Sequence, residues 1–181
     1  MILTGLCARE AWLGRMTRNQ DMGRRAAVVL CVAAALMGPG GLAGAADGTL
    51  RGDVLVCVAD LRSDAVSVVD PGTGVVVDSV PVGDGPDSVA VSPDGSRVYV
   101  TDSGSDTVSV ISTRHCAVTA TVAVGDGPNS LAVGPGGSQV CVSDFNADTL
   151  SVVDTATARA TDTVAVGSGP TGVAAARGKR A

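Results

Sequence analysis

The residues with the greatest capacity for chemistry in this sequence are aspartates that recur in pairs four positions apart. Asp102 and Asp106 form one pair, and Asp144 and Asp148 form the other. Carboxylates are ligands that hard cations such as Ca²⁺ prefer, and the stretch 144–148 has an oxygen-rich spacing similar to that of calcium loops. The Gly and the distal Glu of an EF-hand are missing, so any site on these four aspartates would bind Ca²⁺ weakly. In the alternative interpretation, they cap turns through hydrogen bonds to the backbone.

The residues that catalysis would need are scarce. His115 is the only histidine and is expected in a turn, while the only glutamate is Glu10, close to the N-terminus. A hydrolase needs a nucleophile with a positioned base, paired carboxylates or a metal-bound water. The sequence also has no CxxC pair and no His/Cys cluster, so it gives no support for a zinc or haem site. We therefore expect no catalytic residues and no cofactor, and interpret the chain as a non-enzyme.

The charge of the chain argues against anionic partners. From Asp47 onward there are 16 Asp against 8 Arg or Lys, a net charge of −8. Nucleic acids and anionic membranes repel such a surface. The expected partner is a protein or another component of the cell envelope.

Residues 1–46 resemble an export leader. Arg24 and Arg25 precede the apolar run 26–37, and small residues follow as far as Ala45. This order of basic, apolar and small residues is typical of a signal peptide, with cleavage expected near Ala46 or Asp47. The apolar run is too short to cross a bilayer, so no membrane span is expected in the mature chain. We expect the protein to be secreted or held at the cell surface.

The remaining elements repeat with a period of 42 residues. The segment Val80-Pro81-Val82-Gly83-Asp84-Gly85-Pro86 returns as 122–128 and again, with changes, as 164–170. The segment Val98–Asp102 has counterparts at 56–60 and 140–144. A fixed period of this length indicates a structural repeat that stacks on its neighbours.

One period contains four short strands separated by turn residues. The expected strands are 87–92, 97–102, 107–112 and 117–124, and the sequence Ser92-Pro93-Asp94-Gly95 is a strong turn signal between the first two. Four antiparallel strands in about 40 residues match the blade of a β-propeller. We therefore predict an all-β fold of propeller blades within residues 47–176, with a β-sandwich as the alternative.

The stretch 85–111, which contains Tyr99-Val100-Thr101-Asp102, resembles the YVTN family of β-propeller repeats. The resemblance extends over roughly residues 54–176, and Asp102 stands where the family usually has Asn. It implies an exported or surface-layer propeller, usually with seven blades and often with no assigned activity. On this basis we expect a non-catalytic binding or cell-surface structural module. The alternatives are a lactonase-like propeller hydrolase and a non-functional truncated gene product.

The number of repeats differs from that family pattern. Three strands are expected within 54–82, two full blades follow, and residues 171–176 are expected to supply one more first strand, for twelve strands in all. Propellers have four to eight blades, so three blades' worth of strands predicts an open arc or a fragment of a larger propeller. The short basic tail 177–181 departs from the repeat and favours truncation. A further alternative is self-association through the open blade faces, with the chain as one part of an oligomeric ring.

Two cysteines test this arrangement. Cys57 and Cys141 occupy the same position two repeats apart. One blade lies between them in a propeller arc, so we expect buried thiols too far apart for a disulfide.

Overall fold

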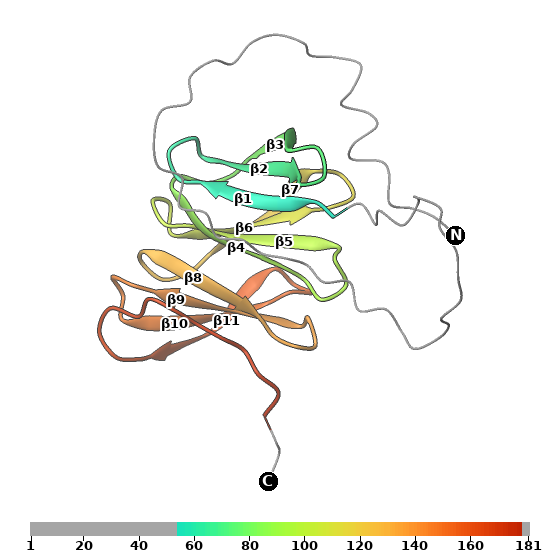
Figure 1. Cartoon of the computed structure of the whole chain (residues 1–181). Helices are drawn as coiled ribbons and strands as arrows, with labels where there is room; N and C mark the ends of the chain where they lie inside the picture. Colours follow the sequence, from blue (N-terminus) through green and yellow to red (C-terminus); the bar gives the residue numbers. More distant parts are fainter. Residues whose placement is uncertain (1–53, 179–181) are drawn as a thin grey trace.

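The computed structural model describes residues 54–178, which form eleven β-strands in three antiparallel sheets (Figure 1). The N-terminal sheet has three strands: β1 (Val56–Asp60), β2 (Ala65–Asp70) and β3 (Val75–Pro81). The middle sheet has four: β4 (Pro86–Val91), β5 (Arg97–Asp102), β6 (Thr107–Ser112) and β7 (Ala117–Ala123). The C-terminal sheet has β8 (Pro128–Val133), β9 (Gln139–Asp144), β10 (Thr149–Asp154) and β11 (Arg159–Ala165).

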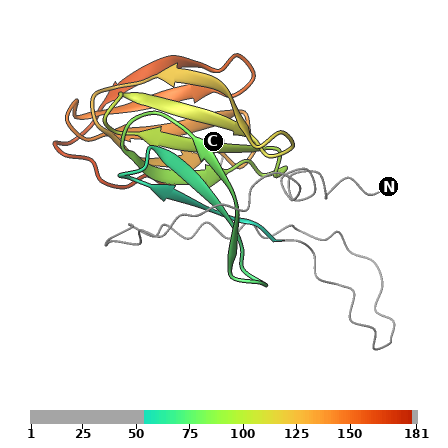
Figure 2. The same cartoon turned by 90° about the horizontal axis from the view of Figure 1, so that it is seen from above.

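Each sheet is a meander in which consecutive strands pair, and the three sheets stack face to face (Figure 1). Figure 2 shows the same stack from above, with the N-terminal sheet on one side of the other two. This is the arrangement of β-propeller blades, so the predicted fold class is confirmed. The predicted limits of the strands in the middle sheet are correct to within one residue at each end.

The turns between strands depend on residues that accept a positive φ. Three aspartates, Asp64, Asp106 and Asp148, adopt φ of 49°, 55° and 57° in the turns that follow β1, β5 and β9. Asp tolerates this left-handed conformation better than most residues because its short side chain can hydrogen-bond locally. The same backbone geometry is thereby repeated every 42 residues.

Two apolar cores hold the sheets together, and each lies between two neighbouring sheets. Between the N-terminal and middle sheets, the buried residues include Val66, Val68 and Val80 on one side and Val98 and Val100 on the other. Between the middle and C-terminal sheets, the counterparts 42 positions later are buried: Val108, Val110, Val122, Val140 and Val142. Tyr99 adds the one large aromatic side chain of this second core. The repeat therefore specifies an interface as well as a sheet.

One strand prediction is wrong. Residues 171–176 are not in a strand, so the described part of the chain has eleven strands rather than twelve. The physical reason is that a first strand of a blade pairs with the second strand of the same sheet, as β4 pairs with β5. No second strand follows this segment within the described residues, so its backbone has no ladder to join.

The expected leader 1–46 lies outside the described residues, as does the end of the basic tail. Within residues 54–178, no helix has the length and apolar character needed to cross a bilayer. Cys57 in β1 and Cys141 in β9 belong to the N-terminal and C-terminal sheets, with the middle sheet between them, as expected. The prediction that both thiols are buried is wrong, because each cysteine is only half-buried.

Candidate functional site

The aspartates in the turns after β1, β5 and β9 connect each sheet to the loop that leads to the next one. Oδ1 of Asp64 accepts a hydrogen bond of 3.0 Å from the backbone N–H of Gly85. Oδ1 of Asp106 accepts one of 2.9 Å from Gly127, and Oδ1 of Asp148 accepts one of 2.8 Å from Gly169. The backbone carbonyl of each of these aspartates also accepts an N–H, from Val82, Val124 and Val166 respectively. We call these three residues the staple aspartates.

A second set of aspartates is buried at the ends of β5 and β9. Asp102 and Asp144 are both fully buried. Oδ2 of Asp102 accepts hydrogen bonds from Ser109 at 2.7 Å and Thr107 at 3.1 Å, while Oδ1 has no hydrogen-bond partner. Burial raises the pKa of Asp102, and the two hydroxyl donors partly offset this effect.

Asp144 has the same environment one repeat later. Its Oδ2 accepts hydrogen bonds from Ser151 at 2.7 Å and Thr149 at 2.9 Å, and its Oδ1 likewise has no partner. In the N-terminal sheet, Ser67 donates to Oδ2 of Asp60 at 2.5 Å. The sequence interpretation did not identify the serines, although their 42-residue spacing in phase with the aspartates is a readable signal.

The four aspartates proposed as calcium ligands therefore have defined structural positions. Asp106 and Asp148 hold turns, whereas Asp102 and Asp144 accept hydroxyl donors inside the sheets. Within residues 54–178, no three His, Cys, Asp or Glu side chains lie close enough together to hold a metal ion. The geometry agrees with the turn-capping interpretation for the staple aspartates.

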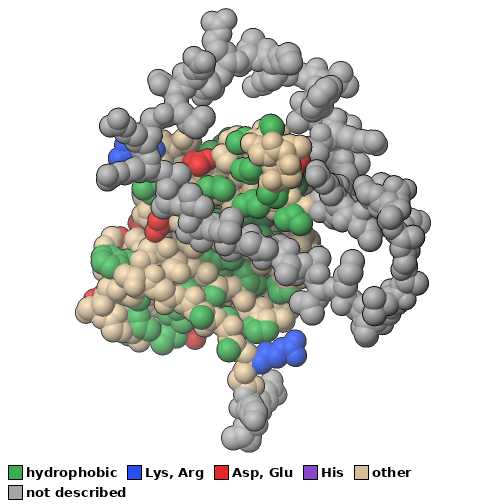
Figure 3. Space-filling view, in the orientation of Figure 1, with side chains coloured by type: hydrophobic (Ala, Val, Ile, Leu, Met, Phe, Trp, Pro, Cys, Tyr) green, Lys and Arg blue, Asp and Glu red, His purple; other side chains and the backbone are tan. Residues whose placement is uncertain are grey.

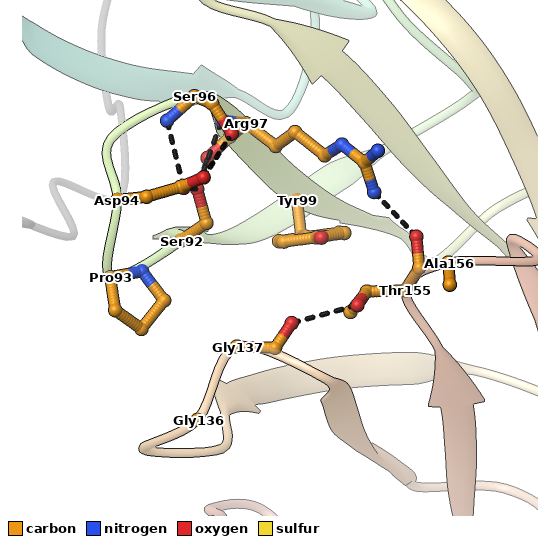
Figure 4. A pocket seen from close by; sticks show the side chains of 10 residues that line it. All are labelled: Ser92, Pro93, Asp94, Ser96, Arg97, Tyr99, Gly136, Gly137, Thr155 and Ala156. Atoms are coloured by element: carbon orange, nitrogen blue, oxygen red, sulfur yellow. Dashed lines mark hydrogen bonds between the residues drawn. The ribbon is translucent and has the colours of Figure 1, made fainter.

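A pocket of about 340 Å³ opens on the opposite loop edge, between the middle and C-terminal sheets (Figure 4). One wall is formed by Pro93 and Asp94 in the turn between β4 and β5 and by Arg97 at the start of β5. The turn Gly136-Gly137 and residues Thr155 and Ala156 form the other wall. Tyr99 lines the pocket from the core between these sheets. We call this the interblade pocket.

The walls of the interblade pocket are held by hydrogen bonds that Figure 4 marks. Nη1 of Arg97 donates to the backbone carbonyl of Thr155 and so joins the two sheets. The hydroxyl of Thr155 donates to the carbonyl of Gly137 at 2.7 Å. Both walls are thus fixed by contacts between residues far apart in the sequence.

Both carboxylate oxygens of Asp94 accept hydrogen bonds within its own turn. Its Oδ1 accepts Ser92 Oγ at 2.6 Å and the N–H of Ser96 at 3.1 Å, and its Oδ2 accepts Ser96 Oγ at 2.8 Å. The Ser92 hydroxyl and the two Ser96 donors lower the pKa of Asp94 to about 2. Asp94 is therefore ionised at neutral pH and is a poor proton donor or acceptor for catalysis.

Arg97 is the cation of the interblade pocket. A guanidinium has five N–H donors, and its Nη1 is directed at Thr155, so others remain for a ligand. Arg97 is exposed at the pocket, whereas Tyr99 is buried beneath it. His115, the histidine discussed above, is exposed in the turn between β6 and β7 and does not line this pocket.

The sequence interpretation gave Arg97 no functional role. The pocket could not be read from one repeat, because it forms between turns from two different sheets. The sequence does single out this residue, because the equivalent positions of the other repeats are the uncharged Leu55 and Gln139.

Comparison with solved structures places this fold among β-propeller proteins. The chain is similar to Kuenenia stuttgartiensis hydrazine synthase, with a TM-score of 0.63 and 26% sequence identity over 65% of this chain. It is also similar to apo AztD from Citrobacter koseri, with a TM-score of 0.57 and 18% identity over 68% of this chain. A second Citrobacter koseri AztD structure gives a TM-score of 0.59 and 18% identity over 71%.

These matches cover only 34%, 35% and 36% of the other chains, so this chain spans about a third of the proteins that it resembles. No family model matches the sequence, and no curated protein sequence matches it. The comparisons therefore establish a β-propeller fold over part of a propeller's length.

Proposed function

We propose that this chain is a non-catalytic binding module of an exported β-propeller of the YVTN type, and that the interblade pocket receives a small ligand bearing carboxylate or carbonyl acceptors. The observation that carries the proposal is the chemistry of the pocket's two charged residues. Asp94 is ionised and engaged by its own turn, while Arg97 has donors left over. Such a pocket can hold an acceptor group but has no group suited to transfer a proton.

The position of the pocket supports this assignment. Loops on a rigid scaffold are common binding sites, and here the two walls are turns of sheets that share an apolar core. Gly136 leaves open space at one wall, since a side-chain carbon at this residue would have no atom within 4 Å.

Binding is tested by titrating the ¹⁵N-labelled chain with sodium citrate, with sodium chloride at matched ionic strength as the control. We expect saturable shifts of the amide signals of Arg97, Gly136 and Gly137 in citrate alone. Arg97→Gln removes the charge but keeps a side chain that the next repeat already uses at Gln139. This variant should lose the citrate shifts, and shifts of equal size in the variant or in chloride would overturn the proposal.

The lactonase alternative has a direct test. The chain is incubated with γ-butyrolactone and hydrolysis is followed by titration of the released acid. We expect no rate above that of buffer. Hydrolysis that scales with protein concentration would replace the binding assignment with an enzymatic one.

The export part of the proposal rests on the leader sequence. Sequencing the N-terminus of protein recovered from culture medium or from the cell envelope should give a start near Ala46 or Asp47. An intact Met1 found only in the cytosol would contradict export.

A further inference from the structure

Among residues 54–178, no strand pairs with the inner edge of the N-terminal sheet, which is β1. Its strand order is β1-β2-β3, whereas the other two sheets begin with an additional strand, β4 or β8. β4 pairs with β5, and β8 pairs with β9, through the edge that corresponds to the open edge of β1. The ladder groups along β1 therefore face a position that a strand occupies in both other sheets.

On the two outer faces of the stack, residues at repeat positions that are buried between sheets elsewhere are exposed or half-buried. Val80 and Val122 face the next sheet and are 2% and 3% exposed, but their counterpart Val164 is 45% exposed. Val98 and Val140 face the preceding sheet and are buried, whereas their counterpart Val56 is only half-buried. Val58 differs in the same way from Val100 and Val142.

Figure 3 shows hydrophobic side chains along the lower border of the molecule, on the side of the C-terminal sheet. Exposed apolar residues of the C-terminal sheet and its loops include Phe145, Val164 and Val166. At the other end of the stack, Val54 and Leu61 are exposed next to β1. Val164 and Val166 at one end, and Val56 and Val58 at the other, hold repeat positions that the two internal interfaces already join. The two ends of the stack are therefore complementary at these positions.

A repeated contact between a loop glycine and an aspartate of the next sheet is also missing at the two ends of the stack. A Cβ on Gly83 would lie 2.8 Å from Cγ of Asp102, and one on Gly125 would lie 2.6 Å from Cγ of Asp144. In both cases a loop glycine packs on the terminal aspartate of the second strand in the next sheet. Gly167 is the next member of this series, yet a Cβ there would meet nothing within 4 Å. Asp60 is the aspartate of the series in the N-terminal sheet, and it is only partly buried.

The segment 170–175 has the sequence of the missing inner strand. Its residues correspond to Pro86–Val91 of β4, which pairs with β5 in a defined register. Shifting that register by the repeat places Pro170 opposite Asp60, Val173 opposite Val58 and Ala175 opposite Val56. Within one copy, however, this segment and β1 lie at opposite ends of the stack (Figure 1).

We propose that two copies of this chain associate head to tail, each supplying its segment 170–175 as the inner strand on β1 of the other. Each contact then reproduces the internal interface between sheets: Val164 packs toward Val56 and Val58, and Gly167 lies on Asp60. Two copies of three sheets form six blades, within the range of four to eight found in closed propellers. The ring removes both exposed apolar faces and the open edge of β1.

The first test is the mass of the full 181-residue chain in solution, measured by sedimentation across a series of concentrations. We expect a dimer of twice 17.7 kDa. A species that stays monomeric at every concentration would overturn the proposal, and an open series of larger assemblies would overturn the closed ring.

Two variants separate the interface from the fold of one copy. Val164→Asp places a charge at a residue that is exposed in the single copy, and Gly167→Ala adds a methyl group in open space. Both variants should be folded by circular dichroism yet dissociate at concentrations where the unchanged chain is dimeric. Dimers as tight as those of the unchanged chain in both variants would show that this surface is not the interface.

The register is tested by cross-linking. Val56→Cys combined with Ala175→Cys should form a disulfide between two chains under mild oxidation, because the shifted register makes these residues direct neighbours. Val56→Cys combined with Gly172→Cys is the matched control, since Gly172 lies three residues out of register, opposite Ala59. Equal cross-linking in both pairs, or a disulfide formed within one chain, would overturn the register.

Discussion

Gly125 lies directly against Asp144: a methyl group on Gly125 would stand 2.6 Å from both Cγ and Oδ2 of that buried carboxylate. The loop between the middle and C-terminal sheets can therefore pass the end of β9 only because residue 125 has no side chain. This contact joins two sheets, and the same relationship holds between Gly83 and Asp102 one repeat earlier.

Gly125→Ala should lower the free energy of unfolding by about 1–3 kcal/mol, the usual cost of forcing a group into a packed site. Denaturant unfolding followed by circular dichroism measures the change. Gly136→Ala is the control, because a methyl group there meets no atom within 4 Å and residue 136 does not have a positive φ. Equal losses in the two variants would show that the contact with Asp144 has no particular role.

The staple aspartates should tolerate Asn but not Ala. Asp106→Ala removes the hydrogen bond to Gly127 and leaves a residue with φ of 55° that Ala adopts poorly. We expect a loss of about 2–4 kcal/mol in the free energy of unfolding, combining the charged hydrogen bond with the backbone cost. Asp106→Asn keeps an acceptor oxygen and tolerates this conformation, so its loss should be below about 1 kcal/mol. Similar losses in both variants would contradict the stapling role.

Calcium should not stabilise the chain specifically. A ligand that binds only the folded state raises the melting temperature, and the hydrogen bonds of Asp102, Asp106, Asp144 and Asp148 already engage these carboxylates. Melting is compared in millimolar Ca²⁺ and in chelator at matched ionic strength, because screening alone relieves repulsion between carboxylates. A calcium-specific rise that disappears when these four residues are changed to Asn would establish the weak cation site instead.

The turn at Asp94 should weaken in acid. The pKa of Asp94 is lowered from 3.8 to about 2, so its ionised form favours the folded state. The sign follows directly: this stabilisation is present above the unfolded pKa and is lost as the pH falls toward 2. The carboxyl carbon signal of Asp94 should titrate in NMR with a midpoint near that value, and a midpoint at the ordinary value would contradict the hydrogen-bonded turn.

Asp102 has the opposite effect on stability in acid. Burial raises its pKa, so protonation at low pH removes the free-energy cost of a buried charge. The pH dependence of stability must therefore be read as a difference between the unchanged chain and Asp94→Asn. Below pH 4 the unchanged chain should lose more stability than this variant, which lacks the titrating group.

The sequence by itself determined the repeated unit. Two series of left-handed turn residues recur at a 42-residue step, the aspartates at 64, 106 and 148 and the glycines at 85, 127 and 169. The four strand segments of one period follow from local chemistry. Strand limits such as Arg97–Asp102 could be predicted because side-chain patterning and turn residues act over a few neighbouring positions. The staple aspartates and the buried Asp–Ser pairs could also have been predicted from the sequence, since both recur every 42 residues.

Only the tertiary structure decided which contacts form between residues of different repeats. The interblade pocket requires Arg97 and Thr155 to meet across two sheets, and their separation of 58 positions carries no periodic signal. The segment 170–175 has the sequence of a strand but joins no ladder among residues 54–178, because strand formation depends on a neighbouring strand supplied by another part of the chain. Exposure follows the same rule: Val122 and Val164 occupy one repeat position, and the presence or absence of a neighbouring sheet makes one buried and the other exposed.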